Sequence, residues 1–152
     1  MKTIFASGLL ALALLATPAA AAPPEGQAAA IPDPYQLSLM IYGSLTALDQ
    51  ANATGNYTVL RALAAPSFQA INSPEALAGV FGKYRRAHVS LAPVVLFQPT
   101  LTQEPQIGAD GFLRLKGYFP TRPLRIGFEL AFQNLAGAWR LIALSVTPTQ
   151  AL

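Results

Sequence analysis

Apolar side chains recur at steps of three and four residues after Asp33, which is the period of one face of an α-helix. Asp33 offers a side-chain acceptor for a helix start, and Pro34 suits the first helical position, where no N–H is needed. Gly55 favours the left-handed conformation that ends many helices. The pattern therefore predicts a helix from 34 to about 54, with an apolar face made by Leu37, Met40, Ile41, Leu45 and Leu48.

Two shorter segments of the first half show the same period. Asn56 precedes a short helical segment that ends before Pro66, because the residue before a proline avoids the helical region. Ser73-Pro74 repeats the combination of a cap and a proline, and predicts a third helix to about Ala87. The segment 67–71 between them is predicted to be a short edge strand. The third helix has four positions predicted to face inward: Leu77, Val80, Phe81 and Tyr84.

After His88 the pattern changes from helical to that of strands. The first such segment is β-branched and apolar, and the later ones alternate between apolar and polar positions, with turn residues such as Asp110-Gly111 between them. Because helices come first and strands follow, we predict an α+β fold, in which three N-terminal helices pack on a curved antiparallel sheet. The predicted long strands are 89–97, 112–119, 124–132 and 139–146.

The first 21 residues have the parts of a secretory signal peptide: Lys2, an apolar run over Leu9–Ala16, and small residues up to Ala21. The run is shorter than the roughly 20 residues that a membrane-spanning helix needs. We therefore expect cleavage before Ala22, with an uncleaved anchor as the alternative. A flexible leader over 22–32 and a single domain over 33–148 are expected to follow. In a chain rich in Ala and Leu, this predicts a periplasmic or secreted bacterial protein.

Composition limits the chemistry of the chain. It has no cysteine, which excludes disulfides. Its one histidine is His88, and a single histidine without cysteine argues against zinc sites. The formal net charge of +3 is too small and dispersed to predict nucleic-acid binding. No motif for phosphate binding or for a Ser-His-Asp triad is present. We expect no metal, no cofactor and no stable membrane insertion after the signal is removed.

Three side chains are candidates for acid/base chemistry. Asp49 lies at the border of the apolar face of the first helix, where a carboxylate could act as a general base, although a solvated helix flank is the simpler interpretation. Tyr42 and Tyr84 lie on or beside helix faces that should look at the sheet. Their hydroxyls would either anchor the core or donate to a developing oxyanion.

The stretch Ala47–Phe68 resembles the opening of nuclear transport factor 2-like domains. It has a long helix, a Gly55-Asn56-Tyr57 break, a short helix and then Pro66-Ser67-Phe68. Trp139-Arg140-Leu141-Ile142, after a glycine turn, is similar to the last strand of that family. The resemblance implies an α+β cone. The superfamily includes isomerases, dehydratases, polyketide cyclases and non-catalytic binding modules, so the resemblance implies no single activity.

The apolar rows of such a cone would face a common interior and line a pocket for an apolar small molecule. We therefore expect an exported, non-catalytic module that binds a small molecule or a protein. The alternative is an isomerase- or cyclase-type enzyme with Asp49 as the base and Tyr42 or Tyr84 as the donor. A homodimer through the outer sheet face around Tyr118 and Glu129 is a third expectation. The predicted pocket residues are Met40, Phe68, Phe81, Tyr84, Phe119, Phe128, Phe132 and Trp139.

Overall fold

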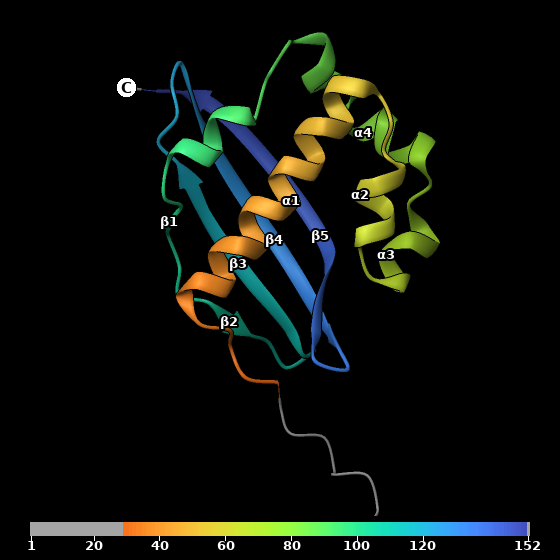
Figure 1. Ribbon diagram of the computed structural model, residues 1–152, viewed down its shortest axis with the longest axis vertical. Coiled ribbons are helices and arrows are strands. Elements are labelled where there is room, and N and C mark those ends of the chain that lie inside the picture. Colours follow the sequence, from red (N-terminus) through yellow and green to blue (C-terminus); the bar gives the residue numbers. More distant parts are fainter. Residues whose placement is uncertain (1–28, 152) are drawn as a thin grey trace, which may run out of the picture.

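A computed structural model describes residues 29–151 of the chain, so the expected signal peptide and most of the expected leader lie outside the described residues. The fold class is α+β, as predicted, with helices that precede an open antiparallel sheet (Figure 1). The helices are α1 (Pro34–Thr54), α2 (Thr58–Leu63), α3 (Pro66–Ile71), α4 (Pro74–Arg86) and the 3-10 helix η1 (Ala92–Leu96). The strands are β1 (Thr100–Leu101), β2 (Gln106–Ile107), β3 (Phe112–Phe119), β4 (Leu124–Leu135) and β5 (Ala138–Gln150).

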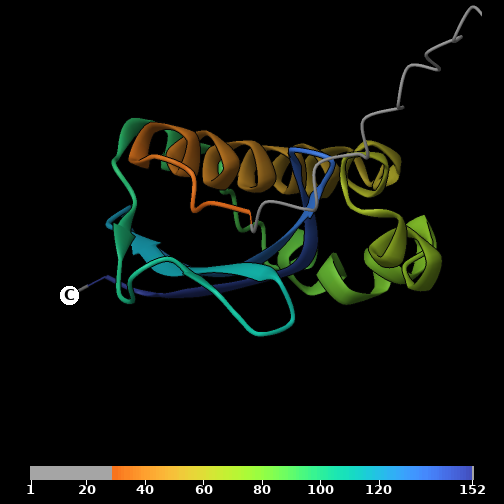
Figure 2. The ribbon, with the colours of Figure 1, turned by 90° about the horizontal axis from the view of Figure 1, so that it is seen from below.

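Helix α1 begins and ends at the residues that the sequence predicts. The Asp33 carboxylate accepts a 2.8 Å hydrogen bond from the Gln36 N–H. Gly55 has φ +77 and donates its N–H to the Ala51 carbonyl. The helix lies across one face of the sheet, and among residues 29–151 no helix covers the opposite face (Figure 2). No helix within residues 29–151 is both long enough and apolar enough to cross a bilayer.

The sheet has the order β1-β3-β4-β5, with β2 also paired to β3. All its pairs are antiparallel, and β4 and β5 shift register between Ala131 and Phe132. Gly117 pairs with Phe128, and a Cβ at Gly117 would lie 2.3 Å from the Thr100 carbonyl oxygen and 2.9 Å from the Phe128 ring. Only glycine therefore allows this close approach. The inward row of β3 and β4 is Leu113, Leu115, Phe119, Ile126, Phe128, Leu130 and Phe132, all buried.

The corner between α1 and α2 is closed by a buried side-chain pair. The Tyr57 hydroxyl donates a 2.7 Å hydrogen bond to the Asn52 side-chain oxygen. Burial raises the pKa of Tyr57, and the nearby Arg85 opposes this. Because Asn52 belongs to α1 and Tyr57 directly precedes α2, this bond fixes the direction in which α2 leaves the long helix.

The prediction of an edge strand over 67–71 is wrong, because these residues form α3. Ala65 is extended, as expected for a residue before proline, but Pro66 then occupies the first position of a new helix. The same proline ends α2 and begins α3. Phe68 is buried from this helix.

The prediction of a strand over 89–97 is also wrong. This segment leaves α4 through a turn and forms η1, which lies beside α1 and not in the sheet (Figure 1). Pro93 has no N–H to contribute to a strand ladder, and Val94 is buried against the core. This apolar, β-branched run therefore covers the core beside α1 instead of adding a strand to the sheet.

Helix α4 begins at the predicted cap, where the Ser73 hydroxyl accepts a 3.1 Å hydrogen bond from the Ala76 N–H. Leu77 and Phe81 are buried as predicted. Val80, predicted to face inward, is instead exposed. The apolar stripe of α4 is narrow, so a residue at its edge points to solvent.

Candidate functional site

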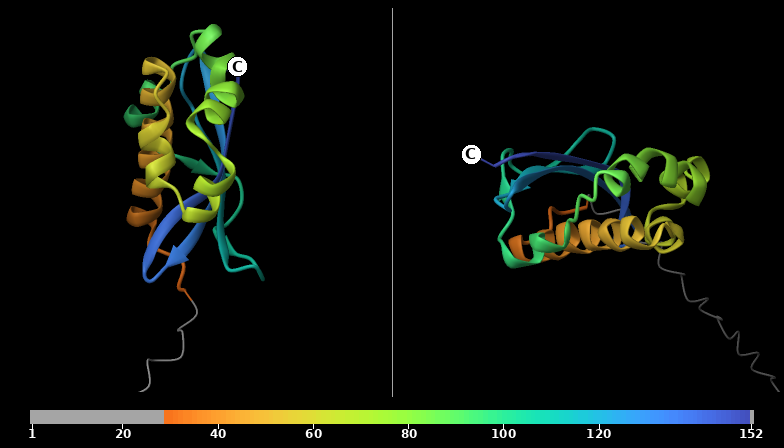
Figure 3. Two further views of the ribbon diagram at one scale, coloured as in Figure 1. Left: turned by 90° about the vertical axis from the view of Figure 1, so that its right-hand side faces the viewer. Right: turned by 90° about the horizontal axis from the view of Figure 1, so that it is seen from above.

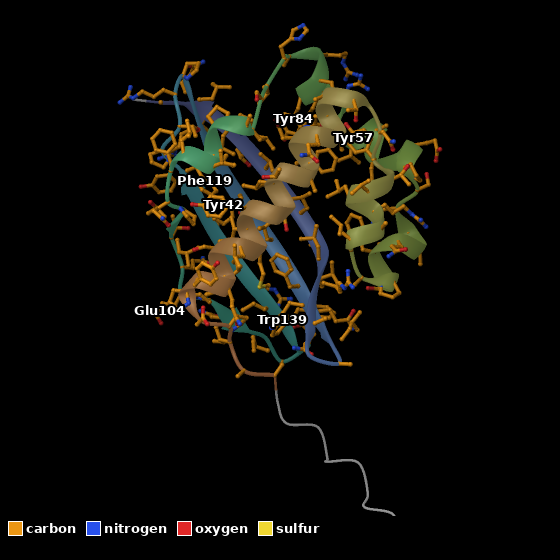
Figure 4. The ribbon with its side chains drawn as sticks, viewed as in Figure 1. Tyr42, Tyr57, Tyr84, Glu104, Phe119 and Trp139 are labelled. Atoms are coloured by element: carbon orange, nitrogen blue, oxygen red, sulfur yellow. The ribbon has the colours of Figure 1, made fainter. Side chains whose placement is uncertain are left out.

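The residues predicted to line one pocket lie in different surroundings. Five of them are packed in the core, each at most 6 % exposed: Phe68, Phe81, Phe119, Phe128 and Phe132. The rings of Phe119 and Phe128 have centroids 5.6 Å apart, and the Tyr42 ring lies 5.6 Å from that of Phe119. Figure 4 shows Tyr42 and Phe119 close together on the η1 side of α1. The interior between α1 and this part of the sheet is therefore filled by its own side chains.

A groove remains where α1 and α2 diverge over the adjoining ends of β4 and β5. Met40, Phe132 and Trp139, all from the predicted set, line this hollow of about 150 Å³. Figure 4 shows Trp139 beside the first half of α1, away from Tyr57 and Tyr84. The other lining residues are Leu39, Gly43, Ser44, Ala47, Leu60, Leu63 and Leu141. We call this hollow the α1–α2 groove.

The α1–α2 groove is lined mainly by apolar side chains, together with Ser44 and the indole of Trp139. Its one side-chain hydroxyl, that of Ser44, donates a 2.8 Å hydrogen bond to the Met40 carbonyl. Leu39 and Leu63 are half exposed at its margin. A Cβ placed on Gly43 would meet no atom within 4 Å, so this glycine leaves the α1 side of the groove open.

Sequence reasoning missed the rim residues Leu39 and Leu63. Leu39 lies beside the apolar stripe of α1, and the relation of α2 to α1 depends on the Tyr57–Asn52 bond. The signal available in the sequence was Gly43, which interrupts a long helix without ending it.

Asp49 and Tyr84 line a second hollow of about 380 Å³, together with Asn52, Arg85 and His88. The Asp49 carboxylate accepts a 2.6 Å hydrogen bond from the Leu91 N–H. The Tyr84 hydroxyl donates a 2.6 Å hydrogen bond to the Val146 carbonyl. Both polar groups therefore connect helices to main-chain atoms of distant segments.

Tyr42 bonds to a different part of the chain from Asp49 and Tyr84. Its hydroxyl donates a 2.6 Å hydrogen bond to the Phe97 carbonyl, just beyond η1. Asp49 holds the segment before η1 and Tyr42 holds the segment after it. Each of the three acid/base candidates thus has a main-chain partner, and the structure brings only Asp49 and Tyr84 to one hollow.

The outer face of the sheet carries the predicted polar rows. Lys116 on β3 and Glu129 on β4 are register partners and form a 2.6 Å ion pair. The Arg125 guanidinium lies 4.9 Å from the centre of the Tyr118 ring. The Lys116–Glu129 pair balances two charges of the face within the chain itself, and the Tyr118 ring contacts the Arg125 cation.

Among residues 29–151, no three side chains of His, Asp or Glu come close enough to hold a metal ion. Comparison with protein families, curated proteins and solved structures gives no significant match to the chain.

Proposed function

We propose that this protein is an exported, non-catalytic module that binds a small apolar ligand in the α1–α2 groove. The observation that carries the proposal is the lining of the groove. Its side chains are apolar apart from the Ser44 hydroxyl, which is already bonded to the main chain, and the indole N–H of Trp139. A site of this kind favours a mostly hydrocarbon ligand, because a polar group placed away from the Trp139 N–H would lose its water without gaining a partner.

The non-catalytic proposal is favoured over an isomerase or cyclase by the bonding of the candidate residues. A general base must reach a substrate proton, and an oxyanion donor must have a free hydrogen. The Asp49 carboxylate holds the Leu91 N–H, and the hydroxyl of Tyr84 is donated to a carbonyl. These bonds support a structural role for the residues.

The size of the groove limits the group that it can hold. Apolar cavities of about 150 Å³ are known to bind benzene, whereas pockets for drug-sized ligands are usually about 300–1,000 Å³. We infer that the groove receives one ring or a short alkyl group. A longer ligand would continue over the exposed margin formed by Leu39 and Leu63.

Membership of the nuclear transport factor 2-like superfamily is part of this proposal. The order of elements, with helices before an open antiparallel sheet, is compatible with such a cone. The resemblance of residues 47–68 supports it, although the predicted edge strand over 67–71 is the helix α3 in this chain. Export to the periplasm or beyond is proposed from the signal pattern of residues 1–21.

Trp139 provides a direct test, because it is the only tryptophan of the chain and lines the groove. Bromobenzene is a ring of suitable size, and its heavy atom quenches indole fluorescence. We expect quenching of Trp139 that saturates with bromobenzene concentration. Quenching that rises without saturation, as in random collisions, would contradict the proposal.

Gly43→Leu separates ligand binding from folding. The added side chain enters open space in the groove, and leucine is favoured over glycine in a helix by up to about 1 kcal/mol. The variant should therefore be at least as stable as the natural chain while losing saturable quenching. Gly79→Leu is the matched control, since Gly79 lies exposed on α4 with equally open surroundings. Equal quenching in all three proteins would count against the groove.

We also propose a homodimer through the outer sheet face, which no helix of residues 29–151 covers (Figure 2). Small side chains lie at the centre of this face: Gly127, Ala131, Ala143, Ser145 and Thr147. They would let two sheets approach closely. Sedimentation that remains monomeric at high protein concentration would exclude this assembly.

A further inference from the structure

A hollow of about 430 Å³ lies where the connection from α4 to η1 meets one end of the sheet. One wall is the segment 87–90 together with Pro93, and the other is the turn 121–124 together with Gln150 of β5. Figures 1 and 3 show these segments at the end of the molecule where β5 ends. We call this space the His88 hollow. It shares no lining residue with the α1–α2 groove.

Both walls of the His88 hollow are held by hydrogen bonds. Thr121 is only 2 % exposed, and its hydroxyl donates to a carbonyl of its own turn. The Ala151 N–H donates a 3.0 Å hydrogen bond to the Pro123 carbonyl, which joins the turn to the end of β5. On the opposite wall, the Val89 N–H donates a 3.0 Å hydrogen bond to the Tyr84 carbonyl. The backbone of the site is therefore in place before a ligand binds, which lowers the entropy cost of binding.

The polar lining of the hollow favours an anion. Arg122 provides a guanidinium, and His88 and Gln150 provide further hydrogen-bond donors. No Asp or Glu is among the lining residues, and neither ion pair found within residues 29–151 involves Arg122. Asp49 lines a separate hollow, where it accepts the Leu91 N–H.

His88 has a conformation that glycine adopts more readily. Its φ is +51, and it directly follows the end of α4, where a left-handed residue is most often glycine. A histidine at this position costs folding free energy, and such strained residues cluster at binding and active sites. Because its side chain lines the hollow, the imidazole is the group for which this cost is retained.

The rest of the lining is largely apolar, and the volume lies within the range of about 300–1,000 Å³ that is usual for small-molecule sites. An apolar wall with a few polar groups is also the usual composition of such a site. The apolar residues of the hollow are Ala87, Val89, Pro93, Pro123 and Leu124.

We propose that the His88 hollow binds a small organic carboxylate with an apolar body. The Arg122 guanidinium donates two parallel hydrogen bonds to the carboxylate, and the His88 imidazole N–H donates a third. The apolar body lies against Val89 and Leu124. One guanidinium matches the single charge of a carboxylate, whereas a phosphate group carries up to two charges at neutral pH. Binding here does not depend on a ligand in the α1–α2 groove.

An NMR titration with benzoate tests the proposal, using the chain from Ala22 onward, which contains all described elements. His88 is the only histidine and Trp139 the only tryptophan, so their side-chain signals report separately on the hollow and on the groove. We expect benzoate to shift the His88 imidazole signals saturably. Benzamide has the same ring without the charge and should bind about tenfold more weakly. A shift confined to Trp139 would place benzoate in the groove and overturn the proposal.

Arg122→Gln should weaken benzoate binding by about tenfold, because the charged donor is lost. Arg140→Gln is the matched control: it removes the same charge from an exposed residue near the other end of the paired β4 and β5. Circular dichroism checks that both variants are folded. An equal loss in the two variants would overturn the proposal.

His88→Asn removes the imidazole and keeps a residue type that tolerates a positive φ. It should weaken benzoate binding by about threefold, measured from the amide signals of residues 121, 122 and 124. Unchanged affinity in His88→Asn would show that the imidazole does not contact the ligand. Benzoate shifts that never saturate, equal affinity for benzamide, or tighter binding of inorganic phosphate would also overturn the proposal.

Discussion

The Tyr42 hydroxyl in the middle of α1 donates a 2.6 Å hydrogen bond to the carbonyl of Phe97, 55 residues further along the chain. The bond joins the long helix to the segment that follows η1. Tyr42, a candidate oxyanion donor from the sequence, therefore holds a surface segment in place.

Tyr42→Phe removes this bond while keeping the ring. We expect the free energy of unfolding to fall by about 0.5–1.5 kcal/mol, the usual net worth of one hydrogen bond. Hydrogen exchange should become faster in the segment 92–99. Tyr35→Phe, at an exposed position of the same helix, is the control. Unchanged exchange in this segment would show that the hydroxyl does not hold it.

Asp49→Ala should lower the free energy of unfolding by about 1–2 kcal/mol, because the Leu91 N–H loses its charged acceptor. Asp49→Asn keeps an acceptor oxygen and should lose less. Chemical denaturation measures both changes, with Gln50→Ala at an exposed neighbouring position as the control. Bromobenzene affinity should be unchanged in Asp49→Asn. A large loss of affinity would favour a direct role for the carboxylate.

His88 has φ +51, a conformation that L-residues adopt at some cost. It follows the end of α4, where the His88 N–H bonds to the Arg85 carbonyl and the Val89 N–H to the Tyr84 carbonyl. His88→Gly should therefore raise the free energy of unfolding by about 0.5–1 kcal/mol. Ala87→Gly, at φ −85, should lower it by a similar amount. Thermal denaturation compares the two, and a loss of stability in both variants would contradict this explanation.

The carboxyl of Asp110 gives a prediction about pH. Hydrogen bonds from the Arg114 guanidinium, and then from the Phe112 N–H, lower the pKa of Asp110 from 3.8 to about 2. The stabilisation from this pair is therefore complete above pH 3.8 and is lost as pH falls towards 2. A carbon-13 NMR titration should give a midpoint near 2. In Arg114→Gln the midpoint should rise only part of the way to 3.8, because the Phe112 N–H still donates. An ordinary midpoint in the natural chain would refute the pairing in solution.

Local signals predicted much of the fold. The cap and proline of α1, its terminal Gly55 and the bounds of β3 depend on residues close in sequence, and the structure agrees with all of them. The alternation along β4 also separated the buried Phe128 from the exposed Glu129. These features could be predicted because the backbone conformation at each position follows from its immediate neighbours.

The candidate site was less predictable. Met40, Phe132 and Trp139 were expected in a pocket and do line the α1–α2 groove. Phe119 and Phe128 were expected there too, but their rings pack against each other. Whether an apolar side chain lines a space or fills it depends on what lies opposite, and that partner comes from a distant part of the chain.

The sequence by itself determined the bounds of α1, α4 and β3, the start of β4, and which face of each long strand is apolar, because these properties follow from caps, turns and periodicity. Only the tertiary structure decided that 67–71 is helical, that 89–97 covers α1, and that Asp49 and Tyr42 hold that segment in place. Those outcomes depend on hydrogen bonds and packing between residues that are far apart in sequence, for which the local pattern contains no signal.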